Sequence, residues 1–578
     1  MAGRRSFLLE KRAKERAVAG GVGTGMWEIS AVVCLFPLSL WTLRALLRTG
    51  AAGRGGASAG AFLRRAFLEY AVVVVPIVSA FTHWVHFAVA GALLVAVGTS
   101  VAAAALARRR RAPGRTRRGR PPPPPAVARL PGQRAPASRS PRRHFVSCYR
   151  AAVLLCTSVA ILAVDFPALF PRRFAKTEDF GSGLMDIGVG SFVLAAALVA
   201  APARAGKQWD ALRGAACRVV PLLVLGSARL ATVKGLEYQE HVSEYGVHWN
   251  FFFTAAAVGF VAAALPGVLR PLGTLLQTSP VGGPCALGTL LMLAHEAALS
   301  SGVADYILRA PRLAGTSLRA LLSQNREGVC SMPGFLALHF LGLGLGQWLR
   351  RGPPAFTDDG DGGGCAKPRV AAAGGACGND DGIRQPGRSR RWWWQFLAKL
   401  VAINALLWAV LLVPRLLLRP GAPPRSGYGV AQIGAVMSRE YDGRVSRRLC
   451  NAPYIVWTLA LSTLVLGTTL AVDLFAAACF PCARRPSCAA AEVGGLGAPP
   501  KALGEGCAGR TTSMIVRALN ANMLPIFLLA NAFTGLVNVS LNTLERSAGP
   551  AFCTMLLHTG LLVALGCTCF VYRWRLKF

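Results

Sequence analysis

The chain has 578 residues, of which 53% are hydrophobic and 16% are charged, with a formal net charge of +38 at pH 7. Its apolar residues form blocks of about 20 residues, the length that crosses a bilayer core, which excludes an ordinary soluble protein. The basic excess is concentrated in an Arg/Pro-rich stretch over residues 108–143. That stretch lacks aromatic side chains for base stacking, which argues against nucleic acid as a partner.

Apolar blocks along the chain predict an all-α, polytopic transmembrane helical bundle with no soluble domain. They are too long and too continuous for the strands of a membrane barrel, and lipid leaves no other fold that satisfies the backbone. We expect about thirteen spans, near residues 28–46, 66–83, 86–106, 146–165, 185–202, 217–234, 250–269, 283–302, 332–350, 395–414, 453–474, 514–537 and 551–572.

The segments between the spans divide the chain. A tail (1–27) precedes spans 1–3 (28–106), and a disordered Arg/Pro-rich loop (107–143) follows them. Spans 4–9 with the main motif-bearing loops cover 144–350, and a Gly/Asp-rich loop covers 351–394. Spans 10–13 lie within 395–578, interrupted by a disordered loop over 478–510. These three loops lack the apolar density that would order them.

Parity of the spans separates the loops into two groups. With thirteen spans, the three disordered loops fall on one face, and the polar, motif-like loops after spans 4, 6, 8 and 10 fall on the other. Because basic loops favour the cytosol, we expect the motif loops to be lumenal and the C-terminus cytosolic. This arrangement predicts a single active face.

The first candidate site follows span 4, in "ILAVDFPALFPRRFAKTEDFGSG". Asp165 ends the span, where the helix dipole and partial desolvation disfavour a charged carboxylate unless a cation lies near. Arg172, Arg173 and Lys176 supply cations within eleven residues. The segment is either an interfacial active site or an ion pair that anchors the loop, and acids at the edge of a span are often functional.

The second candidate is "EYQEHVSEYGVHWNFFF", with Arg229 in the preceding span. In a continued helix, Glu240, His241 and Glu244 would share one face, with His248 beyond Gly246. Histidine with carboxylate suits zinc, but the spacing matches no metal motif, and a solvated polar connector is the alternative.

Two further motifs flank late spans. Arg447 and Arg448 precede span 11 and are placed either to bind a phosphate or to anchor the span at headgroup depth. Five asparagines between residues 520 and 542 are expected to bridge helices, and "LGLGLG" (341–346) is expected to pack against a neighbouring helix. From these residues alone, a transporter and a lipid-modifying enzyme both stay open.

Several strings in order resemble one family: "AVDFP", "FPRRFAKTE", "MDIGVGSF", "EYQEHVSEYGVHWNFFFT", "NREG", "SRRLCNAPY" and "FLLANAFTGLVN". It is the glucosaminyl-phosphatidylinositol inositol acyltransferase family (PIG-W family) of glycosylphosphatidylinositol (GPI) anchor biosynthesis. The resemblance implies a multi-pass enzyme of the endoplasmic reticulum membrane. It would move a fatty acyl group, typically palmitoyl, from acyl-CoA to the inositol 2-hydroxyl of glucosaminyl-phosphatidylinositol, without a metal or other cofactor. The family pattern has one residue between "DFP" and "FPRRFAK", whereas Ala168 and Leu169 both intervene here.

The resemblance points to Asp165 and Lys176 as the catalytic pair, with Asp165 as base and Lys176 as its partner or the oxyanion stabiliser. His241 and His248 are the competing bases, since imidazole needs less tuning of its pKa. The remaining candidates would bind substrate: Glu240 and Glu244 the aminosugar, an arginine the phosphate, and Asn250 beside them. The arginines in question are Arg172, Arg173, Arg229, Arg447 and Arg448. A transporter or lipid flippase is the alternative, although its usual inverted repeats are absent from the sequence.

Overall fold

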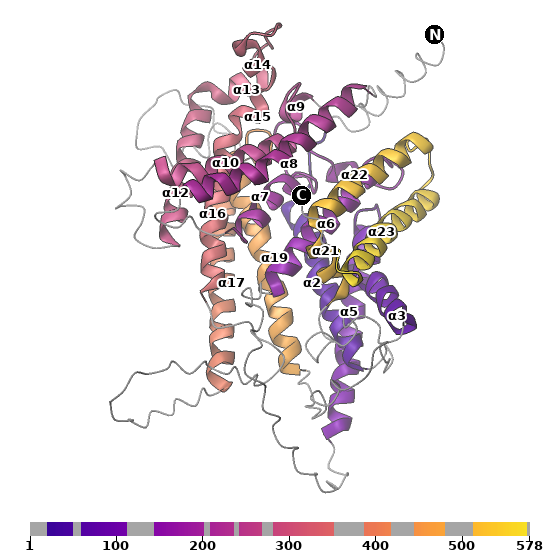
Figure 1. Cartoon of the computed structure of the whole chain (residues 1–578). Helices are drawn as coiled ribbons and strands as arrows, with labels where there is room; N and C mark the ends of the chain where they lie inside the picture. Colours follow the sequence, from indigo (N-terminus) through magenta and orange to yellow (C-terminus); the bar gives the residue numbers. More distant parts are fainter. Residues whose placement is uncertain are drawn as a thin grey trace, which may run out of the picture.

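The computed structural model describes residues 20–49, 59–111, 144–200, 208–235, 242–268, 281–351, 386–417, 444–479 and 513–574. Within these ranges the regular secondary structure is helical, and no strand occurs. The helices pack into one bundle, shown in Figure 1, which confirms the predicted all-α fold class. In that view α9 and α13 to α15 lie at the upper end, whereas α5, α17 and α19 extend to the lower end.

Ten helical stretches in the described ranges are long and apolar enough to cross a membrane. They make this a multi-pass membrane protein. These stretches are α2 (Met26–Thr49), α5 (Val85–Arg111), α6 (His144–Ala163), α8 (Gln208–Gly235), α12 (Gly282–Ala298) continued by η4 (Leu299–Val303) and α13 (Ala304–Arg309), α15 (Arg326–Cys330) with α16 (Met332–Arg350), α17 (Pro386–Leu417), α19 (Ala452–Cys479), α22 (Met523–Ser540) and α23 (Ala548–Val571).

Three of the thirteen expected spans have no counterpart among these ten. The 66–83 stretch is divided into α3 (Ala59–Glu69), the π-helical turn η1 (Tyr70–Val74) and α4 (Val75–Ala80), with Pro76 at the start of α4. The 185–202 and 250–269 stretches form the shorter helices α7 (Ile187–Ala197) and α10 (Phe251–Val268). Hydropathy reports apolar length, whereas proline and π turns set where a helix is interrupted.

The 514–537 stretch is also divided, at Asn522, into α21 (Met514–Ala521) and α22. Asn522 has φ −137° and ψ 53°, outside the helical region, and its side-chain amide donates a hydrogen bond to the Trp574 carbonyl over 2.9 Å. The break therefore lets one asparagine connect α22 to the chain that follows α23.

Three helices, α19, α6 and α2, form the centre of the bundle, and most of each is buried inside the protein. By contrast α5, α8 and α17 are mostly exposed and form the outer surface. Glycines bring α16 close to α7: a Cβ at Gly342 would lie 2.5 Å from the Leu194 side chain, and one at Gly346 would lie 2.4 Å from the Leu198 carbonyl. The glycines of "LGLGLG" therefore serve helix packing, as expected.

Candidate functional site

Four polar segments meet at one end of the bundle: residues 164–186, 242–250, 304–331 and 444–451. Together they are called the polar end below. Gly181 donates a backbone hydrogen bond to Val445 (2.8 Å), and Val247 donates one to Gln324 (3.0 Å). The residues before α2 join them, because the Thr24 amide donates to the Ser182 carbonyl over 2.7 Å. These segments follow expected spans 4, 6, 8 and 10, so the gathering predicted from parity is present in the structure.

Asp165 lies just beyond the last turn of α6 and is only 7% exposed. Its Oδ2 accepts a hydrogen bond from Nδ2 of Asn538, at the end of α22, over 2.7 Å. The Oδ1 of Asn538 in turn accepts from the Thr543 hydroxyl over 3.3 Å. A donor from a helix 373 residues further along the chain therefore orients the candidate base.

Lys176 takes part in an ion pair with Glu244, with Nζ 2.7 Å from Oε2 and 2.9 Å from Oε1. Its side chain is 34% exposed, so the ammonium lies at the rim of the polar end rather than in its interior. Glu244 belongs to the short helix α9 (Val242–Tyr245). The structure thus brings two candidates from different motifs together, whereas Asp165 contacts Asn538.

The charge on Glu244 is shared with Arg447. Arg447 Nη1 lies 3.2 Å from Glu244 Oε1, and its Nε lies 2.9 Å from Asp186 Oδ1. Burial opposes the charge on Arg447, but the carboxylates of Glu244 and Asp186 outweigh it and hold the Arg447 pKa above its ordinary value. Arg447 therefore stays a cation at every ordinary pH.

Asp186 closes this chain of charges back onto the segment that carries Lys176. Its carboxylate accepts hydrogen bonds from the Thr177 hydroxyl (2.9 Å) and from the Gly183 and Thr177 backbone amides (2.8 and 3.2 Å). Because Thr177 directly follows Lys176, the lysine is held through both its side chain and its neighbour's backbone.

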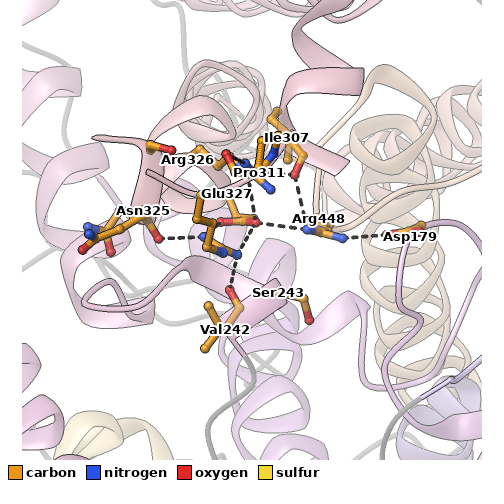
Figure 2. Close-up of polar contacts among 12 residues, drawn as sticks. Asp179, Val242, Ser243, Ile307, Pro311, Asn325, Arg326, Glu327 and Arg448 are labelled. Atoms are coloured by element: carbon orange, nitrogen blue, oxygen red, sulfur yellow. Dashed lines mark hydrogen bonds and ion pairs between the residues drawn. The ribbon is translucent and has the colours of Figure 1, made fainter. Parts of the chain in front are cut away.

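Arg448 joins a second cluster, shown in Figure 2. Its Nη1 lies 2.7 Å from Asp179 Oδ1 and its Nη2 lies 3.0 Å from Glu327 Oε1. Glu327 is completely buried and also pairs with Arg312 over 2.7 Å. Arg326 donates from Nε to the Ile307 carbonyl over 3.1 Å. Arg448 therefore cross-links three segments of the polar end, and its charge is matched by carboxylates.

The other predicted arginines lie nearer the surface. Arg173 pairs with Glu28, in the first turn of α2, with Nη2 2.8 Å from Oε1. Arg172 is exposed in the short 3-10 helix η2 (Arg172–Phe174), and Arg229 is exposed on α8. Of the five arginines predicted to bind phosphate, these last two are the most accessible.

The "EYGVHWN" stretch (residues 244–250) packs against residues 324–325. Gly246 adopts a φ of +113°, which a side chain would strain, and a Cβ there would lie 2.5 Å from Asn325 Cα. The His248 amide donates to Asn325 Oδ1 over 2.8 Å. Asn250 is buried; its Nδ2 donates to the Gly226 carbonyl (2.9 Å), and its Oδ1 accepts from the Phe252 amide (3.0 Å) at the start of α10. Glu240 and His241 lie outside the described residues.

Comparison of the sequence with known proteins shows the family of the chain. The GWT1 family model matches residues 10–569. The chain belongs to the GWT1 family. Similar curated proteins include GPI-anchored wall transfer protein 1 of Aspergillus fumigatus, 32% identical over 459 residues, which are 76% of this chain and 76% of that protein. The proteins of the same name from Yarrowia lipolytica and Candida albicans are 33% and 30% identical, covering 75% and 70% of this chain and 73% and 70% of theirs.

In this GWT1-family chain, sequence reasoning missed the residues that hold the arginine-bearing segment. His295 and Glu296, on α12, both reach it: His295 Nε2 lies 2.9 Å from the Leu449 carbonyl, and Glu296 Oε2 accepts the Ala452 amide at the start of α19 over 2.8 Å. Glu327 was missed as a partner too, whereas Asn538 was among the asparagines expected to bridge helices and does so through Asp165. For Glu296 a signal was available, because an acid inside an apolar block is rare.

Among the residues that the structure describes, no group of three or more His, Cys, Asp or Glu side chains is arranged to hold a metal ion. The carboxylates of the polar end face arginine, lysine, amide and hydroxyl groups instead. The arrangement is suited to proton transfer and to binding a polar headgroup.

Proposed function

We propose that this chain is a membrane O-acyltransferase of GPI-anchor biosynthesis. It would transfer a fatty acyl group, palmitoyl in the first instance, from acyl-CoA to the inositol 2-hydroxyl of glucosaminyl-phosphatidylinositol. The observation that carries the proposal is the match to the GWT1 family over residues 10–569, whose relatives are named GPI-anchored wall transfer proteins. Motifs that carry the resemblance, among them "FPRRFAKTE" and "NREG", lie in the segments that form the polar end.

Acyl transfer to a secondary alcohol requires removal of the hydroxyl proton as the oxygen attacks the thioester carbon. In this proposal Asp165 accepts that proton. The hydrogen bond from Asn538 Nδ2 fixes Oδ2, and so aims the carboxylate. The CoA thiolate departs once the tetrahedral intermediate collapses, and the proton held by Asp165 is available to it.

The intermediate also carries an oxyanion, which a fixed cation stabilises. Lys176 has that role here, and Glu244 positions it through two short contacts. Because Lys176 and Arg447 already face Glu244, it is assigned to positioning rather than to binding the aminosugar. Glu240 is then the acid assigned to the glucosamine ammonium. Arg447 and Arg448 face carboxylates, so the phosphate is assigned to the more exposed arginines, Arg172, Arg173 and Arg229.

An endoplasmic-reticulum location with the polar end in the lumen completes the proposal. The basic 108–143 loop and the C-terminus would then be cytosolic, because basic loops favour that side. The residues before α2 contact the polar end, so they would be lumenal with it.

The test is an assay of membranes that contain the protein, supplied with acyl-CoA and glucosaminyl-phosphatidylinositol. The product expected is an acylated lipid that resists phosphatidylinositol-specific phospholipase C. If well-folded protein forms no acylated lipid, the proposal is refuted. Asp165→Asn and Lys176→Met should each abolish product at normal expression, whereas the control Asp305→Asn, in an exposed pair with Arg309, should not. If His241→Ala or His248→Ala is inactive and Asp165→Asn is active, the base is a histidine.

A further inference from the structure

A groove on the outer surface of the bundle separates the first turns of α2 and α5. It is open along one side and has a volume of about 170 Å³. Trp27, Glu28 and His86 line one end of the groove, called its mouth below. Ala31, Val89 and Leu93 line the apolar remainder. A cavity of about 150 Å³ is enough to hold benzene, so this one accommodates a segment of hydrocarbon chain. Both walls belong to candidate membrane spans, and Trp27 and Leu93 are exposed at the surface, so a lipid chain is the occupant that the groove suits.

Both walls of the groove are attached to the loop that carries Asp165 and Lys176. On the α2 side, Glu28 pairs with Arg173, whose Nη2 and Nε lie 2.8 and 3.2 Å from Oε1. On the α5 side, the His83 amide, in the turn before the helix, donates to the Leu169 carbonyl over 3.0 Å. The mouth of the groove therefore lies against the 165–176 loop.

The side chains at this end suit the junction between a lipid's headgroup and its chains. Trp27 is 70% exposed and stacks on His86, with ring centroids 6.5 Å apart and planes at 22°. Exposed tryptophan at the end of a span is typical of the membrane–water interface. Arg173 neutralises Glu28 with Nε and Nη2, and its side chain is 39% exposed, so its remaining N–H groups can reach a phosphate.

We propose that this groove binds the phospholipid acceptor of the reaction proposed above, with an acyl chain along α2 and α5 and the phosphate at Arg173. The inference rests on that proposed function. In a phosphoinositide the phosphate is bonded directly to the inositol ring, so a phosphate at Arg173 places the ring beside the 165–176 loop. In acyl-CoA a long pantetheine arm separates the phosphates from the thioester, which is why the groove is assigned to the acceptor rather than the donor.

Filling the groove tests the assignment. Ala90 lines it and is exposed, so Ala90→Trp occupies the space without disturbing the interior of the bundle. Val97→Trp is the matched control, because Val97 is 60% exposed on the same helix and does not line the groove. If the tryptophan side chain excludes two methylene groups of the lipid from the groove, the affinity for that lipid falls about tenfold. Ala90→Trp should therefore raise the KM for glucosaminyl-phosphatidylinositol about tenfold and leave kcat and the KM for acyl-CoA unchanged.

A raised KM for acyl-CoA instead would overturn the assignment to the acceptor, and no change in either KM would overturn the site. A phosphatidylinositol with a photoactivatable diazirine in its acyl chain gives a second readout that does not depend on turnover. Cross-links should map to residues 27–31 and 85–93 in the unmodified protein and disappear in Ala90→Trp. Equal labelling by the corresponding phosphatidylcholine would show that the groove binds any bilayer lipid, which contradicts the proposal.

The two proposals fail in different ways. Absence of acyl transfer by well-folded protein removes the proposed function, whatever the cross-links show. Transfer with normal kinetics in Ala90→Trp and no labelling of the groove removes only the docking site.

Discussion

Replacing Glu327 with glutamine removes one negative charge from the centre of the polar end while keeping a side chain of the same shape. Glu327 is fully buried and contacts Arg312 over 2.7 Å and Arg448 over 3.0 Å, with Arg326 at 3.6 Å. Removing one partner of a buried ion pair costs about 3–5 kcal/mol, because the opposite charge stays buried without compensation. Arg448 keeps Asp179 and Arg312 is partly exposed, so we expect the lower limit, about 3 kcal/mol.

That loss is measurable as thermal unfolding of the purified protein in detergent. At about 2 °C per kcal/mol for a large domain, Glu327→Gln should lower Tm by roughly 6 °C. The control is Asp305→Asn, whose partner Arg309 is 2.9 Å away but whose pair is 62% and 80% exposed. Exposed pairs contribute about 0.5 kcal/mol or less, so its Tm should fall by about 1 °C at most. Equal shifts for the two variants would refute the view that Glu327 is a buried cross-link.

Two other substitutions test neighbouring parts of the site. Glu244→Gln frees Lys176 and should lower kcat for acyl transfer about tenfold or more, with little change in the KM for glucosaminyl-phosphatidylinositol; a rise in that KM at constant kcat would instead make Glu244 a headgroup ligand. Gly328→Ala places a Cβ 2.4 Å from the Trp249 ring and should lower Tm by several degrees, whereas Gly259→Ala, with nothing within 4 Å, should not. Equal Tm values for the two alanine variants would show that the Trp249 ring moves aside at no cost.

The long helices could be predicted because a continuous apolar block of about 20 residues is itself the signal of a membrane span. Ten of the expected spans coincide with helices long enough to cross a membrane, among them α6 and α19. The 66–83 stretch differs because Pro76 and a π turn interrupt it, and these are local backbone events that average hydropathy does not register. Parity predicted that four loops share one face, and these four segments do meet. The thirteen-span count behind that prediction is not confirmed, because ten of the described helical stretches are long enough to cross a membrane.

Individual pairings in the site could not be predicted. Lys176 pairs with Glu244, 68 residues away, and Arg448 with Glu327, 121 residues away. Which carboxylate meets which cation depends on how the helices pack, and the sequence offered several acids within reach of each. The family resemblance pointed to Lys176 as the partner of Asp165, but the loop between them contains the 3-10 helix η2, and the Lys176 ammonium contacts Glu244 of α9.

The hydrogen bond between Asn538 and Asp165 has a consequence for biogenesis. The asparagine is made 373 residues after the aspartate, which at 5–20 residues per second is a delay of roughly 20–75 s. During that interval the early helices can be in the membrane, but the Asp165 carboxylate lacks its Asn538 partner until α22 is inserted. A chain that stops short of residue 538 would retain both Asp165 and Lys176 and still lack the amide that orients the proposed base, Asp165. Late truncations should therefore yield membrane-inserted, inactive protein that the cell's quality control treats as unfinished.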